Sequence, residues 1–177
     1  MAKAPGTKGS ATPLLAQEPR VAYRVAYRHT QGVEAFVHQL RGATSMELVE
    51  AERAGVTVTF LKDLSKRLGV PVVQLYRIIG LPKATAERKA AAGDGLAGSP
   101  GLAALGLARL LGIAQDIVER STAEEAAGFD AGHWLGRWIE RPQRALGGLR
   151  PADFVDTPTG VHIVARLLGA IESGAYQ

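Results

Sequence analysis

The residue types that most often carry out catalysis or bind metals are present in this chain, but not at working spacings. Cysteine is absent, which excludes a thiol nucleophile, a disulfide and a thiolate-bound metal. Asp153 and Asp156 are three residues apart, but Asp156 precedes a predicted helix, where its charge suits the helix dipole. The four histidines lie in separate segments without metal-ligand spacing; they are His29, His38, His133 and His162. We therefore predict that the chain is not an enzyme and holds neither a metal nor another cofactor.

Basic and polar side chains gather in a helix–glycine–helix segment at residues 71–92, and this segment could contact nucleic acid. Apolar residues flank Gly80, as in a helix-turn-helix motif whose second helix enters the major groove of DNA. The early polar residues of that second helix then meet base edges or phosphates. The predicted DNA contacts are Lys83, Thr85 and Arg88, with Lys89 assigned to phosphate.

Two features of this segment favour a plain joint between helices of an α-helical bundle instead. Tyr76 stands four residues before the turn glycine, where helix-turn-helix motifs usually carry a small residue. The second helix is rich in alanine, which leaves few side chains to read bases. DNA binding would then depend mainly on phosphate contacts and on salt concentration. The sequence leaves both interpretations open.

The charge of the chain is divided along its length. Residues 1–93 carry 14 Lys and Arg against 7 Asp and Glu, whereas residues 94–177 carry 7 against 10. A basic first half and an acidic second half indicate two partners, one of them polyanionic. Drift of surface charge without function is the alternative.

The elements that must position these residues are predicted to be helices, which makes the fold class all-α. Thr44 and Glu47 form a capping-box pattern, Pro100 lies in the first turn of a long helix, and Asp130 caps a helix that carries two tryptophans. We expect the long helix to join two domains and to carry a dimer contact through Leu102, Leu105, Leu110 and Ile113. The helices are predicted at residues 45–55, 58–68, 71–79, 82–92, 100–120, from 131 up to the proline at 142, and 157–174. A short helix is expected to begin at Pro151, and Thr122 starts a further capping-box pattern.

The stretch from Trp138 to Phe154 has the spacing of a compact helical adaptor. Trp134 and Trp138 are four residues apart, so they share one helix face, and we predict that Trp138 lies in the core. Arg141, Arg144 and Arg150 could face an acidic partner, although a solvated charged surface explains them equally well. Other residues of the stretch are predicted to set the direction of the backbone; they are Pro142, Gly147, Gly148 and Pro151.

The first 41 residues are predicted to form a basic extension that is partly disordered. They contain a tandem copy of Val-Ala-Tyr-Arg at residues 21–24 and 25–28. Alternating Tyr and Arg could stack on bases and pair with phosphates, but a short duplication in a disordered tail is the preferred interpretation. The chain has neither a signal-peptide pattern nor an apolar run of about 20 residues, so we predict a cytoplasmic protein without a membrane partner.

The order of these motifs resembles the Xre-type antitoxins of RES–Xre toxin–antitoxin modules, whose C-terminal domain is shared with the MbcA and ParS antitoxins. The resemblance covers residues 42–177 and is most specific in the C-terminal part. Gln143 replaces the usual Asn, which moves the amide one carbon outward. The residues that carry the resemblance are Trp138, Pro142-Gln143, Ala145-Leu146-Gly147-Gly148, Pro151, Phe154-Val155, Thr157, Gly160, Val164, Leu168, Ile171 and Gly174.

The resemblance implies an antitoxin of a type II system that neutralises a RES-domain toxin and represses its own operon by binding operator DNA. Such toxins deplete cellular NAD, so the small molecule would belong to the toxin and not to this chain. Members of the family are dimers that contact the toxin through the C-terminal domain. Carried onto this sequence, the resemblance points to the final helix and to the chain end, Ser173, Gly174, Ala175, Tyr176 and Gln177. The predicted toxin contacts are Gly174 to Gln177 together with Arg141 and Arg144, which are added because of their charge.

The expected organisation is an Xre-like helix-turn-helix domain at residues 42–93, a connecting and dimerisation helix at 94–121, and a toxin-binding domain at 122–177. The alternative function is a stand-alone helix-turn-helix regulator whose C-terminal domain binds another protein. An α-helical adaptor without DNA binding is a third interpretation, favoured if the departures at Tyr76 and in the alanine-rich helix are decisive.

Overall fold

The computed structural model describes residues 25–122 and 126–172, and these residues are mainly helical, which confirms the all-α class. Two short 3₁₀ helices, η2 (Arg144–Leu146) and η3 (Pro151–Asp153), precede the last helix. A two-residue antiparallel ladder pairs β1 (Val56–Thr57) with β2 (Gly95–Leu96). The α-helices are α1 (Gly32–Gly42), α2 (Ser45–Ala54), α3 (Val58–Leu68), α4 (Val72–Ile78), α5 (Lys83–Ala92), α6 (Ser99–Arg120), α7 (Ala131–Trp138) and α8 (Pro158–Glu172).

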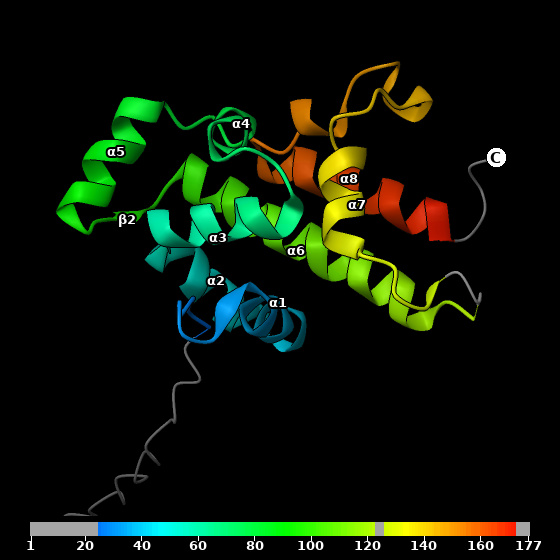
Figure 1. Ribbon diagram of the computed structural model, residues 1–177, viewed down its shortest axis with the longest axis horizontal. Coiled ribbons are helices and arrows are strands. Elements are labelled where there is room, and N and C mark those ends of the chain that lie inside the picture. Colours follow the sequence, from blue (N-terminus) through cyan, green and yellow to red (C-terminus); the bar gives the residue numbers. More distant parts are fainter. Residues whose placement is uncertain (1–24, 123–125, 173–177) are drawn as a thin grey trace, which may run out of the picture.

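Helix α6 runs through the middle of the molecule and packs against α1, α7 and α8 (Figure 1). By length and composition it is apolar enough to cross a membrane, but 61% of its apolar window is buried inside the fold, as in the core helix of a globular protein. Leu105 and Leu110 are buried in the chain's own core. The expected dimer contact is therefore wrong for these two residues, because burying them within one chain leaves them unavailable to a second copy.

Helix α1 belongs to this core, which differs from the expectation of an extension up to residue 41. Its inward face buries Val33, Phe36, Val37 and Leu40 against α3 and α6. The helical spacing of these apolar residues explains the burial. The core begins even earlier, because Val25 is buried with them.

The second copy of the Val-Ala-Tyr-Arg repeat, residues 25–28, is part of the fold, whereas the first copy lies outside the described residues. The ring of Tyr27 packs against Phe36 and Phe60, with ring centroids 5.8 Å and 4.9 Å away. Its hydroxyl donates a hydrogen bond of 2.5 Å to Asp63. Burial, followed by this bond, raises the pKa of Tyr27. Tyr27 is therefore a core anchor and not an exposed platform for stacking bases.

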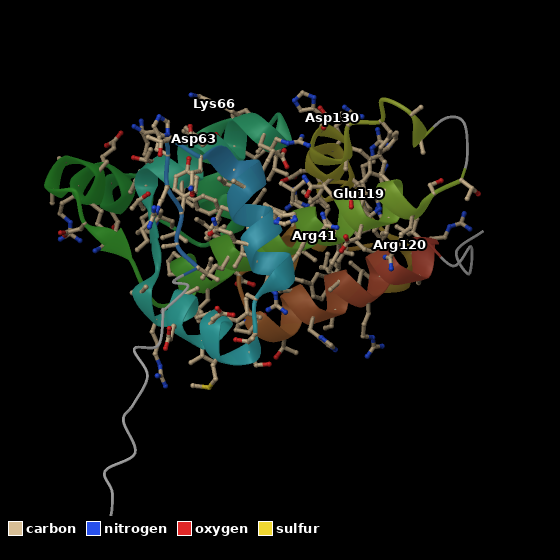
Figure 2. The ribbon with its side chains drawn as sticks, turned by 90° about the horizontal axis from the view of Figure 1, so that it is seen from below. Arg41, Asp63, Lys66, Glu119, Arg120 and Asp130 are labelled. Atoms are coloured by element: carbon tan, nitrogen blue, oxygen red, sulfur yellow. The ribbon has the colours of Figure 1, made fainter. Side chains whose placement is uncertain are left out.

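Polar side chains fix the ends and crossings of the helices. The capping box of α2 is present, with Thr44 Oγ1 accepting from Glu47 N at 3.3 Å and Glu47 Oε2 accepting from Thr44 N at 2.8 Å. In the last turn of α1, Arg41 pairs with Asp116 and Glu119 of α6 (Figure 2). The capping box expected to start at Thr122 includes residues outside the described part of the chain.

One apolar core runs from Val25 to Leu168 and includes residues of every α-helix. The segments expected to bind DNA and toxin therefore share one core, in which α3 packs against α7 and α6 packs against α8.

Candidate functional site

The joint between α4 and α5 has the turn predicted for a helix-turn-helix motif. Gly80 adopts a left-handed φ of 67°, and Leu81 N donates to Tyr76 O at 2.8 Å. Tyr76 itself is buried, and burial raises the pKa of its phenol. The aromatic side chain is thus accommodated inside the joint and does not keep α4 and α5 apart, because the two helices are in contact.

Helix α5 lies at one end of the molecule and buries little of its surface against the other helices (Figure 1). Ala86 is its one buried residue. Lys83 and Arg88 are exposed, and Lys83 lies 3.5 Å from Glu87 in an ion pair along the helix. Thr85 is half-buried, so it presents less polar surface than the sequence indicates. Lys89 bends back and donates to Gly95 O at 3.0 Å, which ties it to the start of β2.

Helix α7 is placed against α3 by its cap and by small residues. Asp130 Oδ1 accepts from His133 N at 3.0 Å, as the sequence predicts for an N-cap. A Cβ at Gly136 would overlap the carbonyl oxygen of Leu68, and a Cβ at Gly132 would overlap the Arg67 side chain. These two glycines, four residues apart on one helix face, therefore allow the backbones of α3 and α7 to approach closely.

Three aromatic rings form a ladder along α7. The rings of Trp134 and Trp138 are stacked, with centroids 5.6 Å apart and planes 15° apart. Trp138 is 7% exposed, which confirms the prediction that it lies in the core. Trp134 is half-buried, and Phe129, 6.2 Å further along, is 44% exposed. The ladder therefore runs from the core to the surface.

The loop after α7 projects from the molecule above that helix (Figure 1). Gln143 holds the loop closed: its N donates to Leu149 O at 2.9 Å, its O accepts from Gly148 N at 3.0 Å, and its side-chain amide donates to Arg141 O at 3.0 Å. Gly147 and Gly148 both have left-handed φ values, of 65° and 85°. Other residue types are strained in that region, so the Gly-Gly pair sets the turn as predicted.

The arginines of this region fall into two groups. Arg150 is engaged, because it lies 2.9 Å from Glu140 and 2.6 Å from Asp153. Arg141 and Arg144 are exposed, and neither has an ion-pair partner among the described residues. They are the arginines of the loop with charge available to a partner. Gly174, Ala175, Tyr176 and Gln177 lie outside the described residues.

The remaining motif residues support the backbone. Pro151 is buried at the start of η3, whereas Pro142 is exposed and Leu146 is half-buried. Gly160 N donates to Thr157 Oγ1 at 3.1 Å, and a Cβ at Gly160 would overlap the Phe154 carbonyl oxygen. In the Thr-x-x-Gly motif, Thr157 therefore caps the start of α8, and Gly160 lets the backbone of α8 approach the Phe154 carbonyl closely.

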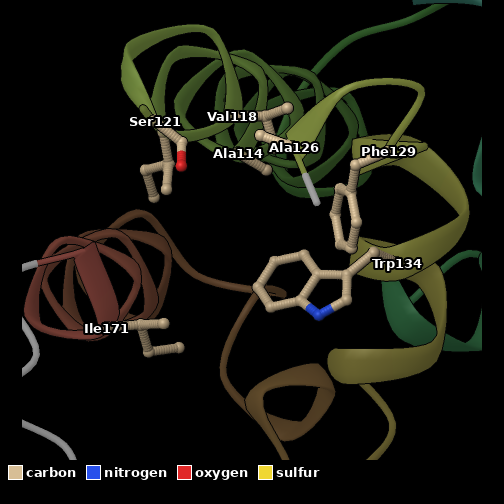
Figure 3. Close-up of a pocket in the computed structure, with 8 residues that line it drawn as sticks. Ala114, Val118, Ser121, Ala126, Phe129, Trp134 and Ile171 are labelled. Atoms are coloured by element: carbon tan, nitrogen blue, oxygen red, sulfur yellow. The ribbon is translucent and has the colours of Figure 1, made fainter. Parts of the chain in front are cut away.

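The main apolar pocket lies beside the ladder, between the ends of α6 and α8 (Figure 3). Its volume is about 290 Å³, and Phe129, Trp134 and Ile171 are its largest lining residues together with Ile117. Neither this pocket nor Phe129 is predicted by the sequence motifs. An exposed aromatic directly before the Asp130 cap is the signal that could have indicated it. The described residues contain no cluster of His, Asp and Glu that could hold a metal ion.

Comparison with known proteins identifies this C-terminal region. Residues 127–174 match the family described as the antitoxin Xre/MbcA/ParS C-terminal toxin-binding domain. The chain is also 34% identical over 158 residues to the "Prs ADP-ribosylating antitoxin" of Sphingobium sp. (strain YBL2). That alignment covers 89% of this chain and 89% of the relative. The chain belongs to the Xre/MbcA/ParS antitoxin family.

Membership places the structural features in context. The α7 ladder, the Gln143 loop and the whole of α8 fall within the toxin-binding domain of this antitoxin family. The expected role as an antitoxin with a toxin partner is confirmed at this level. The loop arginines lie in this domain, and so do Phe129, Trp134 and Ile171 of the pocket, whose remaining wall comes mainly from α6 and Ala126. The domain is therefore the candidate site for the toxin.

Proposed function

We propose that this chain is the antitoxin of a type II system that binds and neutralises a RES-domain toxin depleting cellular NAD, and that it represses its own operon by binding DNA. The observation that carries the proposal is the similarity to an antitoxin along 89% of both chains. The relative's name refers to ADP-ribosylation. Transfer of ADP-ribose breaks the nicotinamide–ribose bond of NAD, so a toxin with that chemistry also consumes NAD.

The toxin-binding surface is proposed to include the loop that Gln143 closes and the chain end. Arg141 and Arg144 are exposed there without an ion-pair partner among the described residues, so their charge can be met by acidic groups of the toxin. Closure of the loop by hydrogen bonds from Gln143 supports the proposal, because a pre-organised loop loses less entropy on binding. The chain end, Gly174 to Gln177, comes after α8 in the sequence and is proposed to contact the toxin as well.

Operator binding is proposed for the α4–α5 segment of a homodimer. Helix α5 offers Lys83 and Arg88 on exposed surface, with Thr85 partly available. Lys89 must give up its bond to Gly95 before it can reach a phosphate. Helix α5 and the end of α8 lie at opposite ends of the molecule (Figure 1). This separation supports a protein that holds DNA and toxin at the same time.

The test of the proposed function is co-expression with the protein encoded by the neighbouring reading frame. We expect that protein alone to stop growth and lower cellular NAD, and this chain to restore both. Modified target protein, detected by mass spectrometry, would separate ADP-ribosylation from simple NAD hydrolysis. A harmless neighbour would contradict the proposal and favour the stand-alone regulator.

Charge reversal tests the loop. Arg144→Glu should weaken the complex with the toxin about tenfold or more, because an attraction across the interface becomes a repulsion. Arg53→Glu is the matched control, since Arg53 is an exposed arginine of α2 outside the toxin-binding domain. Isothermal titration calorimetry measures both affinities. Equal affinity of the two variants would remove Arg144 from the interface.

Salt dependence tests the DNA contacts. Replacing Arg88 and Lys89 by alanine should weaken operator binding and reduce the salt slope by about 1 for each phosphate that is no longer neutralised. Fluorescence anisotropy at several salt concentrations measures both quantities, with Arg53→Ala as the control. An unchanged affinity would remove α5 from the DNA groove and favour an adaptor without DNA binding.

A further inference from the structure

The apolar pocket beside the α7 ladder has the composition of a receptor for a hydrophobic side chain. Its walls come from the last turns of α6, from the 126–134 segment and from Ile171 near the end of α8 (Figure 3). Apolar side chains form nearly all of its lining, and none of the lining residues is charged. Such a lining provides no cation for the phosphates of a nucleotide, so a dinucleotide is a poor match.

The volume of the pocket, about 290 Å³, lies at the lower limit of small-molecule sites. Small-molecule sites usually measure roughly 300–1,000 Å³. One large aliphatic or aromatic side chain fits this volume better. The exposure of Phe129 at the rim, 44%, leaves aromatic surface in water that a partner would cover.

The position of the pocket indicates which partner this is. Phe129, Trp134 and Ile171 all lie within residues 127–174, the part that matches the toxin-binding domain. Ile171 stands in the last turn of α8, immediately before the chain end that is proposed to contact the toxin. Three of the large residues that line the pocket therefore belong to the domain that is assigned to the toxin.

We propose that this pocket is the hydrophobic anchor site of the complex, in which one large apolar side chain of the toxin inserts between Trp134, Phe129 and Ile171. The inference rests on the proposed function, because it specifies how the same domain holds its toxin. Anchors of this kind occupy desolvated pockets at the centre of an interface and carry a large share of its binding energy.

A spectroscopic experiment observes the pocket directly. The chain contains two tryptophans, Trp134 at the pocket and Trp138 stacked behind it. Labelling the antitoxin with 5-fluorotryptophan gives two ¹⁹F resonances, and Trp134→Phe assigns them. On saturation with the toxin encoded by the neighbouring reading frame, the Trp134 resonance should shift. The shift should disappear when the anchoring side chain of the toxin, located by alanine scanning, is removed.

Affinity measurements give a second, independent result. Phe129→Ala and Ala126→Glu should each weaken toxin binding tenfold or more, the first by removing a wall and the second by placing a charge in the pocket. Met46→Ala is the matched control, because Met46 is a large apolar residue of α2 that is 67% exposed and outside the matched domain. Circular dichroism confirms that each variant is folded, and both altered residues are at least partly exposed.

The outcomes separate the two proposals. If the unaltered chain fails to bind the toxin, the proposed function fails. If it binds but the Trp134 resonance stays in place, or if Phe129→Ala and Ala126→Glu keep the parental affinity, the anchor site is wrong while the function stands. A shift of the Trp134 resonance in the free chain on Tyr176→Ala would assign the pocket to the chain's own end and overturn the proposal.

Discussion

Arg67 is a residue that joins several elements through polar contacts. Its guanidinium pairs with Glu34 of α1 and lies 2.6 Å from Asp130, the cap of α7. Gln115 of α6 donates to the same Glu34 at 2.5 Å. These bonds connect α1, α3 and α6, which lie outside the toxin-binding domain, to α7, which lies inside it. The toxin-binding domain is thus fixed in place by side chains that lie outside it.

The pKa of Asp130 gives a prediction for acid stability. The backbone N–H of His133, followed by the Arg67 guanidinium, lowers this pKa from 3.8 to about 2. A lowered pKa stabilises the fold above about pH 4, and this contribution is lost as pH falls towards 2. Asp130→Asn keeps a capping oxygen but removes the charge, so it should cost about 1 kcal/mol near neutrality, with a difference from wild type that shrinks between pH 4 and 2.

Urea denaturation at a series of pH values measures that difference. Glu50→Gln is the control, because Glu50 is exposed within α2 and has no ion pair among the described residues. A difference for Asp130→Asn that stays constant down to pH 2 would show that the charge of Asp130 contributes nothing to stability.

At the scale of elements, the crossing of α3 and α7 depends on Gly136. Alanine there should destabilise the protein by about 2 kcal/mol or more, because its Cβ meets the rigid backbone of Leu68 and forces the helices apart. Gly169→Ala on α8 is the matched comparison. A Cβ at Gly169 has no atom within 4 Å, so alanine should stabilise the helix by about 0.5–1 kcal/mol. Thermal unfolding of both variants measures these opposite effects, and equal destabilisation would contradict the steric argument.

Local signals explain which elements could be predicted from sequence. The caps at Thr44 and Asp130 and the left-handed Gly69 define helix ends within a few residues, and the structure has them at these positions. The core role of α1 differs from the prediction because residues 1–41 as a whole are basic, whereas α1 itself has the apolar spacing of a core helix. Non-local bonds could not be predicted either: they are the bond of Lys89 to Gly95, and the partners of Arg67, which are 33 and 63 residues away in the sequence.

At the scale of the whole molecule, the shared core changes what the predicted domain boundaries mean. Residues 42–93 and 122–177 carry the proposed DNA and toxin contacts, but their helices pack against each other and against α6. Toxin and operator DNA would therefore bind different places on one packed core. The pocket likewise depends on more than the toxin-binding segment, since α6 contributes part of its wall. Sequence patterns could indicate the two functional segments, but they could not show that the segments share one core.

The shared core predicts that the toxin-binding segment does not fold alone. A fragment of residues 122–177 lacks α3 and α6, the helices against which α7 and α8 pack. Leu135, Val164 and Leu168, which are buried in the full chain, would then be exposed to water. We expect little helix by circular dichroism, no cooperative melting and toxin binding weakened at least a hundredfold, because folding must accompany binding. A chain that begins at Val25 keeps every described interaction and should melt in one transition. Cooperative melting of the fragment would show that residues 122–177 are an independent domain and that packing against α3 and α6 is not needed to form the site.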